Sequence, residues 1–170
     1  DTSGIAIEYR IPSNTKRIDF IISGRDQLRA NAVVVELKQW DEVEAVTDRD
    51  GIVKTVLGGS MQQTTHPSYQ VSSYVDLIND FNESVSRDQI KLHPCAFLHN
   101  YMIQPGYDPL TDPVYQEYIQ KAPIFDTTGS NELRHFIKKH IKYGDNKEVL
   151  YAIEHGKIKP SKSLQDALSS

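Results

Sequence analysis

The chain has 170 residues, of which 38% are hydrophobic and 25% are charged, and its formal net charge is −4. This composition is typical of a globular domain with a substantial core. The negative charge argues against a protein that coats nucleic acid non-specifically, because such binding needs clustered Lys and Arg. No apolar run is long enough to span a membrane, and no signal-peptide pattern stands at the start. The single cysteine, Cys95, excludes an internal disulfide and suits a reducing cytoplasm.

Three strands are predicted in the first forty residues. Residues 5–11 alternate apolar and polar side chains, which indicates a half-buried strand. The turn sequence PSNT separates this segment from a second alternating strand over residues 17–23, so the two should form a hairpin. A polar turn then leads to a third strand at 32–38, which contains three consecutive valines. We expect these strands to form a meander.

The pattern changes after the third strand. Residues 41–64 are acidic and then glycine-containing, so we expect a mobile loop there. Apolar residues return at helical spacing over 67–82, with Pro67 in the first turn. A further strand is predicted at 94–99, and because a helix intervenes, it could lie parallel to an earlier strand.

From Ser130 onward the pattern is purely helical. Ser130 should cap a helix that ends at Gly144, and further helices should begin near Asp145 and Pro160. The predicted fold class is therefore α/β, with a mixed central sheet and flanking helices over residues 1–126. A helical C-terminal extension or connector should follow over residues 127–170.

The third strand carries charges inside its apolar run. Glu36 and Lys38 are two residues apart, so in a strand they point to the same side as Val34. A buried charge must be paired, bound to a metal or open to a cleft. Asp19 lies on the preceding strand, also in an apolar run. Two such carboxylates with a lysine beside them would suit Mg²⁺ or Mn²⁺, which would polarise a phosphodiester and activate a bound water.

These residues resemble the active-site motif of the PD-(D/E)xK nuclease superfamily. Asp19 is followed on the next strand by Glu36-Leu37-Lys38, and the order of strands and helices matches from the first strand onward. The resemblance implies that Asp19 and Glu36 ligate Mg²⁺ or Mn²⁺, with the backbone carbonyl of Leu37 as a third ligand. Lys38 would orient the attacking water and stabilise the charge of the transition state.

The helix after the third strand extends this resemblance. Gln70 and Tyr74 stand at i, i+4 spacing, similar to the Gln-x-x-x-Tyr signature of the RecB-like branch, whose pair supports the active site. Two features depart from the family pattern. The sequence Arg17-Ile18-Asp19 replaces the nominal Pro-Asp, and the family's opening helix is not visible, which fits an excised N-terminus.

Nearly the whole chain resembles a narrower group of bacterial proteins. In them a nuclease-like domain precedes a Schlafen-type superfamily 1 helicase or P-loop ATPase. This resemblance implies a nuclease that acts on DNA, with RNA as the less favoured substrate. It also implies a helicase-like domain of the same chain that begins just past Ser170.

Alternatives stay open for several residues. Glu8, on the first strand, is an additional candidate ligand, although a surface ion pair with Arg10 or Arg17 is the alternative that we favour. Gln70 and Tyr74 would serve equally as ordinary surface and core residues of a helix. The spacing of the cysteine and the nearby histidines matches no structural zinc site.

Two further alternatives concern the strand and the domain. Glu36 and Lys38 would need no special function on the solvated face of an edge strand, although Val34 would then be exposed beside them. The domain itself would keep the same fold as a catalytically inactive module that binds nucleic acid or protein. A purely structural domain that docks on the motor is the third hypothesis.

Overall fold

The computed structural model describes residues 4–10, 17–26, 29–82, 85 and 89–142, with the backbone alone at 4–10, 17–20 and 81. Its main element is a five-stranded mixed sheet in the order β1-β2-β3-β7-β8. The strands are β1 (Gly4–Arg10), β2 (Arg17–Arg25), β3 (Ala30–Lys38), β7 (Lys91–Leu98) and β8 (Ile124–Phe125). The first three form an antiparallel meander, whereas β3, β7 and β8 are parallel. The predicted α/β class, the meander and the parallel fourth strand are confirmed.

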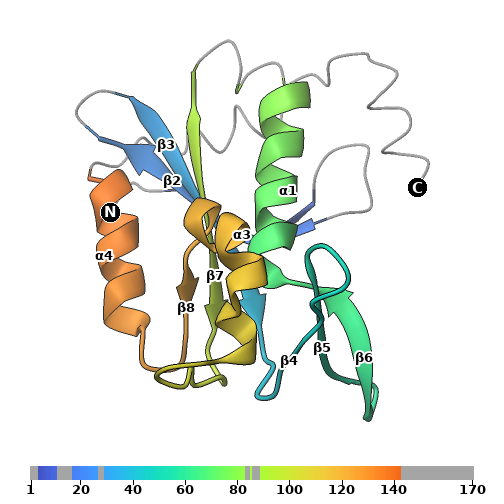
Figure 1. The fold of residues 1–170 in the computed structure, drawn as a ribbon. Coiled ribbons are helices and arrows are strands. Elements are labelled where there is room, and N and C mark those ends of the chain that lie inside the picture. Colours follow the sequence, from blue (N-terminus) through green and yellow to red (C-terminus); the bar gives the residue numbers. More distant parts are fainter. Residues whose placement is uncertain (1–3, 11–16, 27–28, 83–84, 86–88, 143–170) are drawn as a thin grey trace.

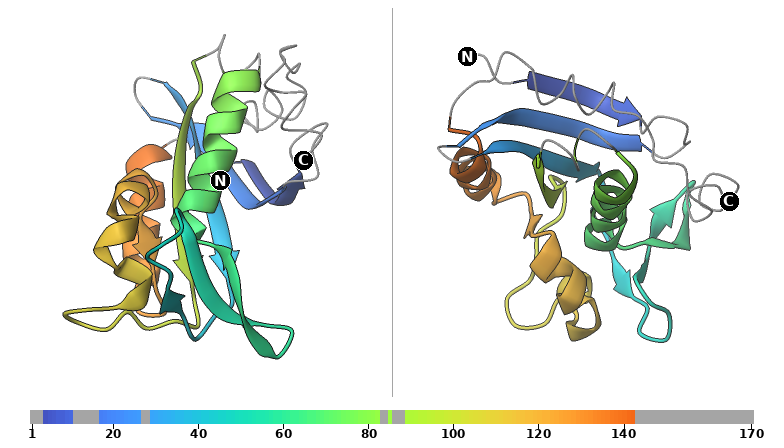
Figure 2. Two further views of the ribbon diagram at one scale, coloured as in Figure 1. Left: turned by 45° about the vertical axis from the view of Figure 1, so that its right-hand side comes forward. Right: turned by 90° about the horizontal axis from the view of Figure 1, so that it is seen from above.

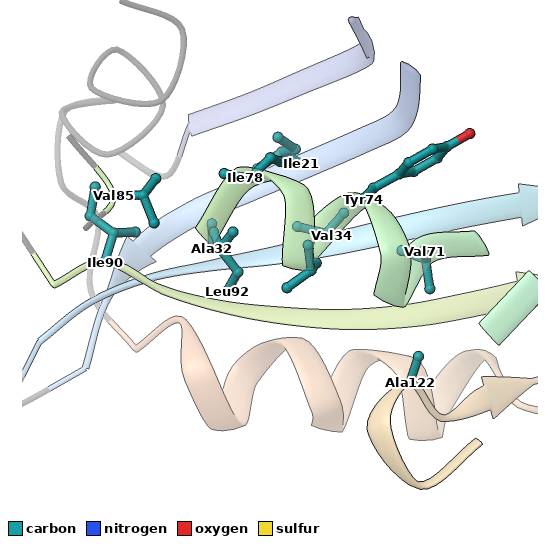
Figure 3. Packing of buried hydrophobic residues seen from close by; sticks show 11 residues of the cluster. Ile21, Ala32, Val34, Val71, Tyr74, Ile78, Val85, Ile90, Leu92 and Ala122 are labelled. Atoms are coloured by element: carbon teal, nitrogen blue, oxygen red, sulfur yellow. The ribbon is translucent and has the colours of Figure 1, made fainter. Parts of the chain in front are cut away.

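Two helices cover opposite faces of this sheet (Figures 1 and 2). Helix α1 (Pro67–Phe81) packs on one face, where Ala32 and Val34 of β3 join its apolar side chains (Figure 3). Helix α4 (Ser130–His140) packs on the other face, where Val33 and Val35 meet Leu133. This division follows from the alternation of side chains along a strand, which sends consecutive residues of β3 to opposite faces.

The segment predicted to be a mobile loop is a second sheet, so that prediction is wrong. Strands β4 (Glu44–Ala45), β5 (Ile52–Leu57) and β6 (Ser60–Thr65) form an antiparallel sheet beside the N-terminus of α1 (Figure 1). Gly58 and Gly59 connect β5 to β6 with φ angles of 61° and 87°. A two-residue turn with positive φ at both positions matches the twist of a hairpin, and glycine adopts it without steric cost. The glycine pair therefore belongs to a tight turn.

Residues 99–123 connect β7 to β8 through three short helical segments. These are η1 (Pro109–Thr111), η2 (Pro113–Tyr115) and α3 (Gln116–Lys121). The Tyr115 ring is buried, and its hydroxyl accepts a hydrogen bond from the Val46 N–H at 2.8 Å and donates one to the Ile52 carbonyl at 2.6 Å. This connection therefore fastens the small sheet to the rest of the fold.

Helix α4 differs from its prediction at both ends. Gly129 occupies the N-cap position, so Ser130 is the first helical residue and the predicted serine cap is wrong. The helix ends at His140, before the predicted stop at Gly144. Phe136 and Ile137 pack with Leu133 against the sheet, so α4 shares the core of the preceding residues. The division at residue 126 stays a prediction, and the later helices lie outside the described residues.

The N-terminus of α1 is held by a buried histidine. His66 Nδ1 accepts a hydrogen bond from the Ser68 N–H at 3.1 Å, and Nε2 lies 2.9 Å from the Leu110 carbonyl. Since Nδ1 is the acceptor, Nε2 carries the proton and donates a hydrogen bond to the Leu110 carbonyl. Burial lowers the pKa of His66 to about 4. The fold therefore requires the neutral imidazole.

We expect acid to weaken the fold through this histidine. The pKa of about 4 lies below the ordinary 6.5, so the stabilisation is complete above pH 6.5 and is lost as the pH falls toward 4. His66→Asn keeps a capping acceptor and does not titrate. Between pH 7 and pH 5, urea denaturation should show that the wild type loses about 2 kcal/mol more than this variant. An equal loss in both proteins would contradict the assignment.

Candidate active site

The candidate site begins with a carboxylate on the central strand. Glu36 is only 3% exposed, and it stands on β3 at the same face as Val34, which α1 covers. Because β3 lies between β2 and β7, the edge-strand alternative for Glu36 and Lys38 is wrong. The Lys38 Nζ atom is 3.2 Å from the Glu36 Oε1 atom. A buried carboxylate is costly without such a partner, so the pair forms one electrostatic unit.

Lys38 is held from two sides. Its ammonium lies beside Glu36 and also over the Trp40 ring, 5.1 Å from the ring centroid. A cation at this distance is attracted by the face of an indole. The Lys38 side chain keeps 20% exposure. The ammonium is thus positioned by its neighbours on a side chain that stays partly exposed to solvent.

Helix α1 contributes the next pair of side chains. Gln70 Nε2 donates a hydrogen bond to the Tyr74 hydroxyl at 2.8 Å, so the predicted i, i+4 pair is formed. Tyr74 belongs to the same buried cluster as Ile21 and Val34, which places it on the face of the sheet that carries Glu36. Figure 3 shows its ring over the sheet, with the hydroxyl toward the end at which β3 finishes. A pocket of about 200 Å³ opens beside Gln70 and Tyr74.

The backbone register brings position 19 toward Glu36. In the β2–β3 pairing, Phe20 stands opposite Val35 and Ile21 stands opposite Val34. One step further along the same register, position 19 comes opposite Glu36. The side chains of Asp19 and of Glu8 lie outside the described residues. It therefore stays a prediction that the carboxylates of Asp19 and Glu36 share one cation. Glu8 stays an additional candidate ligand, with a surface ion pair as the favoured alternative.

The donor atoms suit a hard divalent cation. Carboxylate and carbonyl oxygens are the ligands that Mg²⁺ prefers, and one or two carboxylates commonly suffice beside water and a substrate phosphate. Within the described ranges, no group of three or more His, Cys, Asp and Glu side chains is arranged to hold a metal. A site at Glu36 thus needs Asp19 as its second carboxylate, with the carbonyl of Leu37 as the predicted third ligand.

Sequence patterns did not single out every neighbour of this site. Trp40 is the clearest omission, although its i+2 spacing from Lys38 on an extended chain was a usable signal. Tyr69 and Ser73 line the pocket beside Gln70. Ser73 stands four residues after Tyr69 and three after Gln70, so helical spacing places these side chains on one side of α1.

Comparisons with known proteins identify no relative of this chain. No family model, no curated protein and no solved structure matches it. Within the part of the chain that the structure describes, no helix has the length and apolar character needed to cross a membrane.

We expect the Glu36–Lys38 pair to be energetically coupled. Lys38→Met should destabilise the fold by roughly 1–3 kcal/mol, because it removes a cation from beside a buried carboxylate. Combining it with Glu36→Gln should cost less than the two single changes added together, by about 1 kcal/mol. Urea denaturation of the wild type, both single variants and the double variant measures this difference. Additive effects would show that the two side chains are independent.

Proposed function

We propose that this domain is a metal-dependent nuclease of the PD-(D/E)xK type, which hydrolyses phosphodiester bonds of DNA. The observation that carries the proposal is the buried Glu36 carboxylate paired with Lys38 on a central strand. The register of β2 and β3 pairs Phe20 with Val35, and its continuation by one position would bring Asp19 opposite Glu36, which supports a second carboxylate there. The Gln70–Tyr74 pair on the helix above this face supports the RecB-like branch.

Each residue has a role that follows from its chemistry. Asp19 and Glu36 would hold Mg²⁺ or Mn²⁺, which supplies a Lewis acid and an acidified water when bound. Lys38 supplies a fixed positive charge that orients the attacking water and stabilises the charge that develops on the phosphate. Trp40 keeps the Lys38 ammonium in place through its ring face.

Gln70 and Tyr74 support the site from α1. Their hydrogen bond fixes the orientation of the Gln70 carboxamide, which would otherwise rotate freely. With a net charge of −4, the chain grips a polyanion weakly. A helicase-like domain of the same protein would supply the stronger hold on DNA.

We expect divalent metal to control the activity. Cleavage should require Mg²⁺ or Mn²⁺ and stop with chelator, and Asp19→Asn or Glu36→Gln should abolish it by removing a ligand. Lys38→Ala should reduce kcat by on the order of a hundredfold or more. Glu44→Gln, which changes an exposed carboxylate on β4, is the matched control and should retain full activity. The assay compares single-stranded DNA, double-stranded DNA and RNA at low salt and high enzyme concentration.

The inactive binding module predicts a different outcome in the same experiment. A correctly folded chain would then cleave none of the three substrates. Calorimetry would also detect no Mn²⁺ binding that Glu36→Gln removes. This combination of results would replace the nuclease proposal with the binding module.

A second prediction tests the role of α1. Tyr74→Phe removes the hydroxyl that accepts from Gln70 and leaves the buried ring in place. Cleavage should fall by about tenfold, while the free energy of unfolding falls by only about 1 kcal/mol. Tyr69→Phe, at the same pocket, is the control and should change neither quantity appreciably. Full activity in Tyr74→Phe would restrict the pair to a structural role.

A further inference from the structure

A second pocket lies beside the start of β7, and its lining includes residues from the clusters on both faces of the sheet. It has a volume of about 260 Å³, and it is bounded by the start of β7, the end of α3 and the end of α4. Its polar lining comes from Lys91 and His93 of β7, Gln120 and Lys121 of α3, and His140 of α4. None of the described residues that line it is acidic. In a chain with a net charge of −4, this lining is unusual.

The two histidines of the pocket are held by one buried side chain. Their rings stack with centroids 3.6 Å apart and planes 15° apart. Asn31 is 1% exposed, and its Nδ2 atom donates to the His140 carbonyl at 2.9 Å. Its Oδ1 atom lies 2.9 Å from His93 Nε2. Because an amide oxygen only accepts, Nε2 is protonated and donates this hydrogen bond. Neutral His93 thus keeps Nδ1 unprotonated, and protonation would give it a second donor.

Positive charge is concentrated around these rings. Burial is the main cause that lowers the pKa of His93 to about 4. The neighbouring His140, Lys91 and Arg29 lower it further, whereas Asp26 raises it. Burial is also the main cause of the lowered pKa of His140. The charges of Lys139 and Lys91 lower this pKa further, whereas the charge of Asp26 raises it. A bound anion would offset this field, so the rings would accept protons more readily.

We propose that this pocket binds a terminal phosphate group, with Lys91 and Lys121 as its principal cationic partners. A phosphomonoester carries between one and two negative charges at neutral pH, whereas a backbone phosphodiester carries one. The doubly charged group matches two ammonium groups better. Gln120 adds an amide donor, and His93 and His140 add N–H donors when they take up protons. Inorganic phosphate, a mononucleotide and the phosphorylated end of a nucleic-acid strand share this chemistry.

This inference does not depend on the proposed nuclease activity. Glu36 does not line the pocket, and it lies on the α1 face, whereas His93 stands beside Val33 of the α4 face in the register of β3 and β7. Binding measured with chelator present involves no divalent metal. Glu36→Gln should therefore leave phosphate binding unchanged, which separates failure of one proposal from failure of the other.

The test is calorimetric titration of the whole chain at low ionic strength and pH 7, with chelator. Inorganic phosphate and deoxyadenosine 5′-monophosphate are the first probes. Lys91→Gln and Lys121→Gln should each raise Kd by about tenfold, since each removes a charged hydrogen-bond donor. Lys138→Gln, an exposed α4 residue outside the pocket lining with the same change of charge, is the control and should alter Kd by less than about twofold.

The source of the phosphate follows from two further probes. An oligonucleotide with a 5′-phosphate that binds more tightly than the same oligonucleotide without it supports the proposal, with a strand end as the ligand. If inorganic phosphate binds as tightly as the mononucleotide and the phosphorylated oligonucleotide, the proposal is supported with a free phosphate as the ligand. The His93 imidazole resonances in NMR spectra should also report a raised pKa at saturation with phosphate.

Two results would overturn the inference. The first is a folded wild-type chain that binds neither inorganic phosphate nor the mononucleotide at millimolar concentration. The second is a control variant, Lys138→Gln, that weakens binding as much as Lys91→Gln and Lys121→Gln do. The second result would reduce the effect to the general charge of this face.

Discussion

Strand β3 is buried on both faces, and this constraint organises the molecule. Its residues from Asn31 to Glu36 are all buried, because α1 covers one face and α4 covers the other. A polar side chain buried on such a strand needs a partner, since burial removes most of its contact with water. Glu36 finds Lys38 on the α1 face, and Asn31 finds the two histidines on the α4 face. The two candidate sites thus arise from one strand and differ by which face their residues occupy.

Much of the sheet was predictable because its signals are local. The alternation along the first two strands, the valine run of the third strand and the helical spacing over residues 67–82 all report which side chains face a core. The second sheet escaped prediction because β4 has two residues and the outer positions of β6 are polar, so neither strand shows a strong alternation. The remaining clue was the glycine pair after β5, whose positive φ angles suit a hairpin as well as a loop. Strand β8 is also only two residues long.

The two candidate sites differ in how visible they are in the sequence. Glu36 and Lys38 stood out because charges within a run of valines conflict with burial unless they pair or act. The network of Asn31, His93 and His140 gave no such signal, because its hydrogen bonds join residues 62 and 109 positions apart. Only the pairing of β3 with β7 and the packing of α4 bring these residues together. Function that depends on such distant contacts is invisible to local patterns.

The hydroxyl of Tyr115 has a consequence for how the chain acquires its structure. It bonds to the backbone at Val46 and Ile52, which precede it by 69 and 63 residues. During synthesis, the small sheet would therefore leave the ribosome well before the residue that fastens it. Closing so long a loop has an entropic cost that must be met before the bond forms. The small sheet should consequently consolidate late, after the connection from β7 has docked, and its strands would spend the intervening time with part of their backbone hydrogen-bonded only to water.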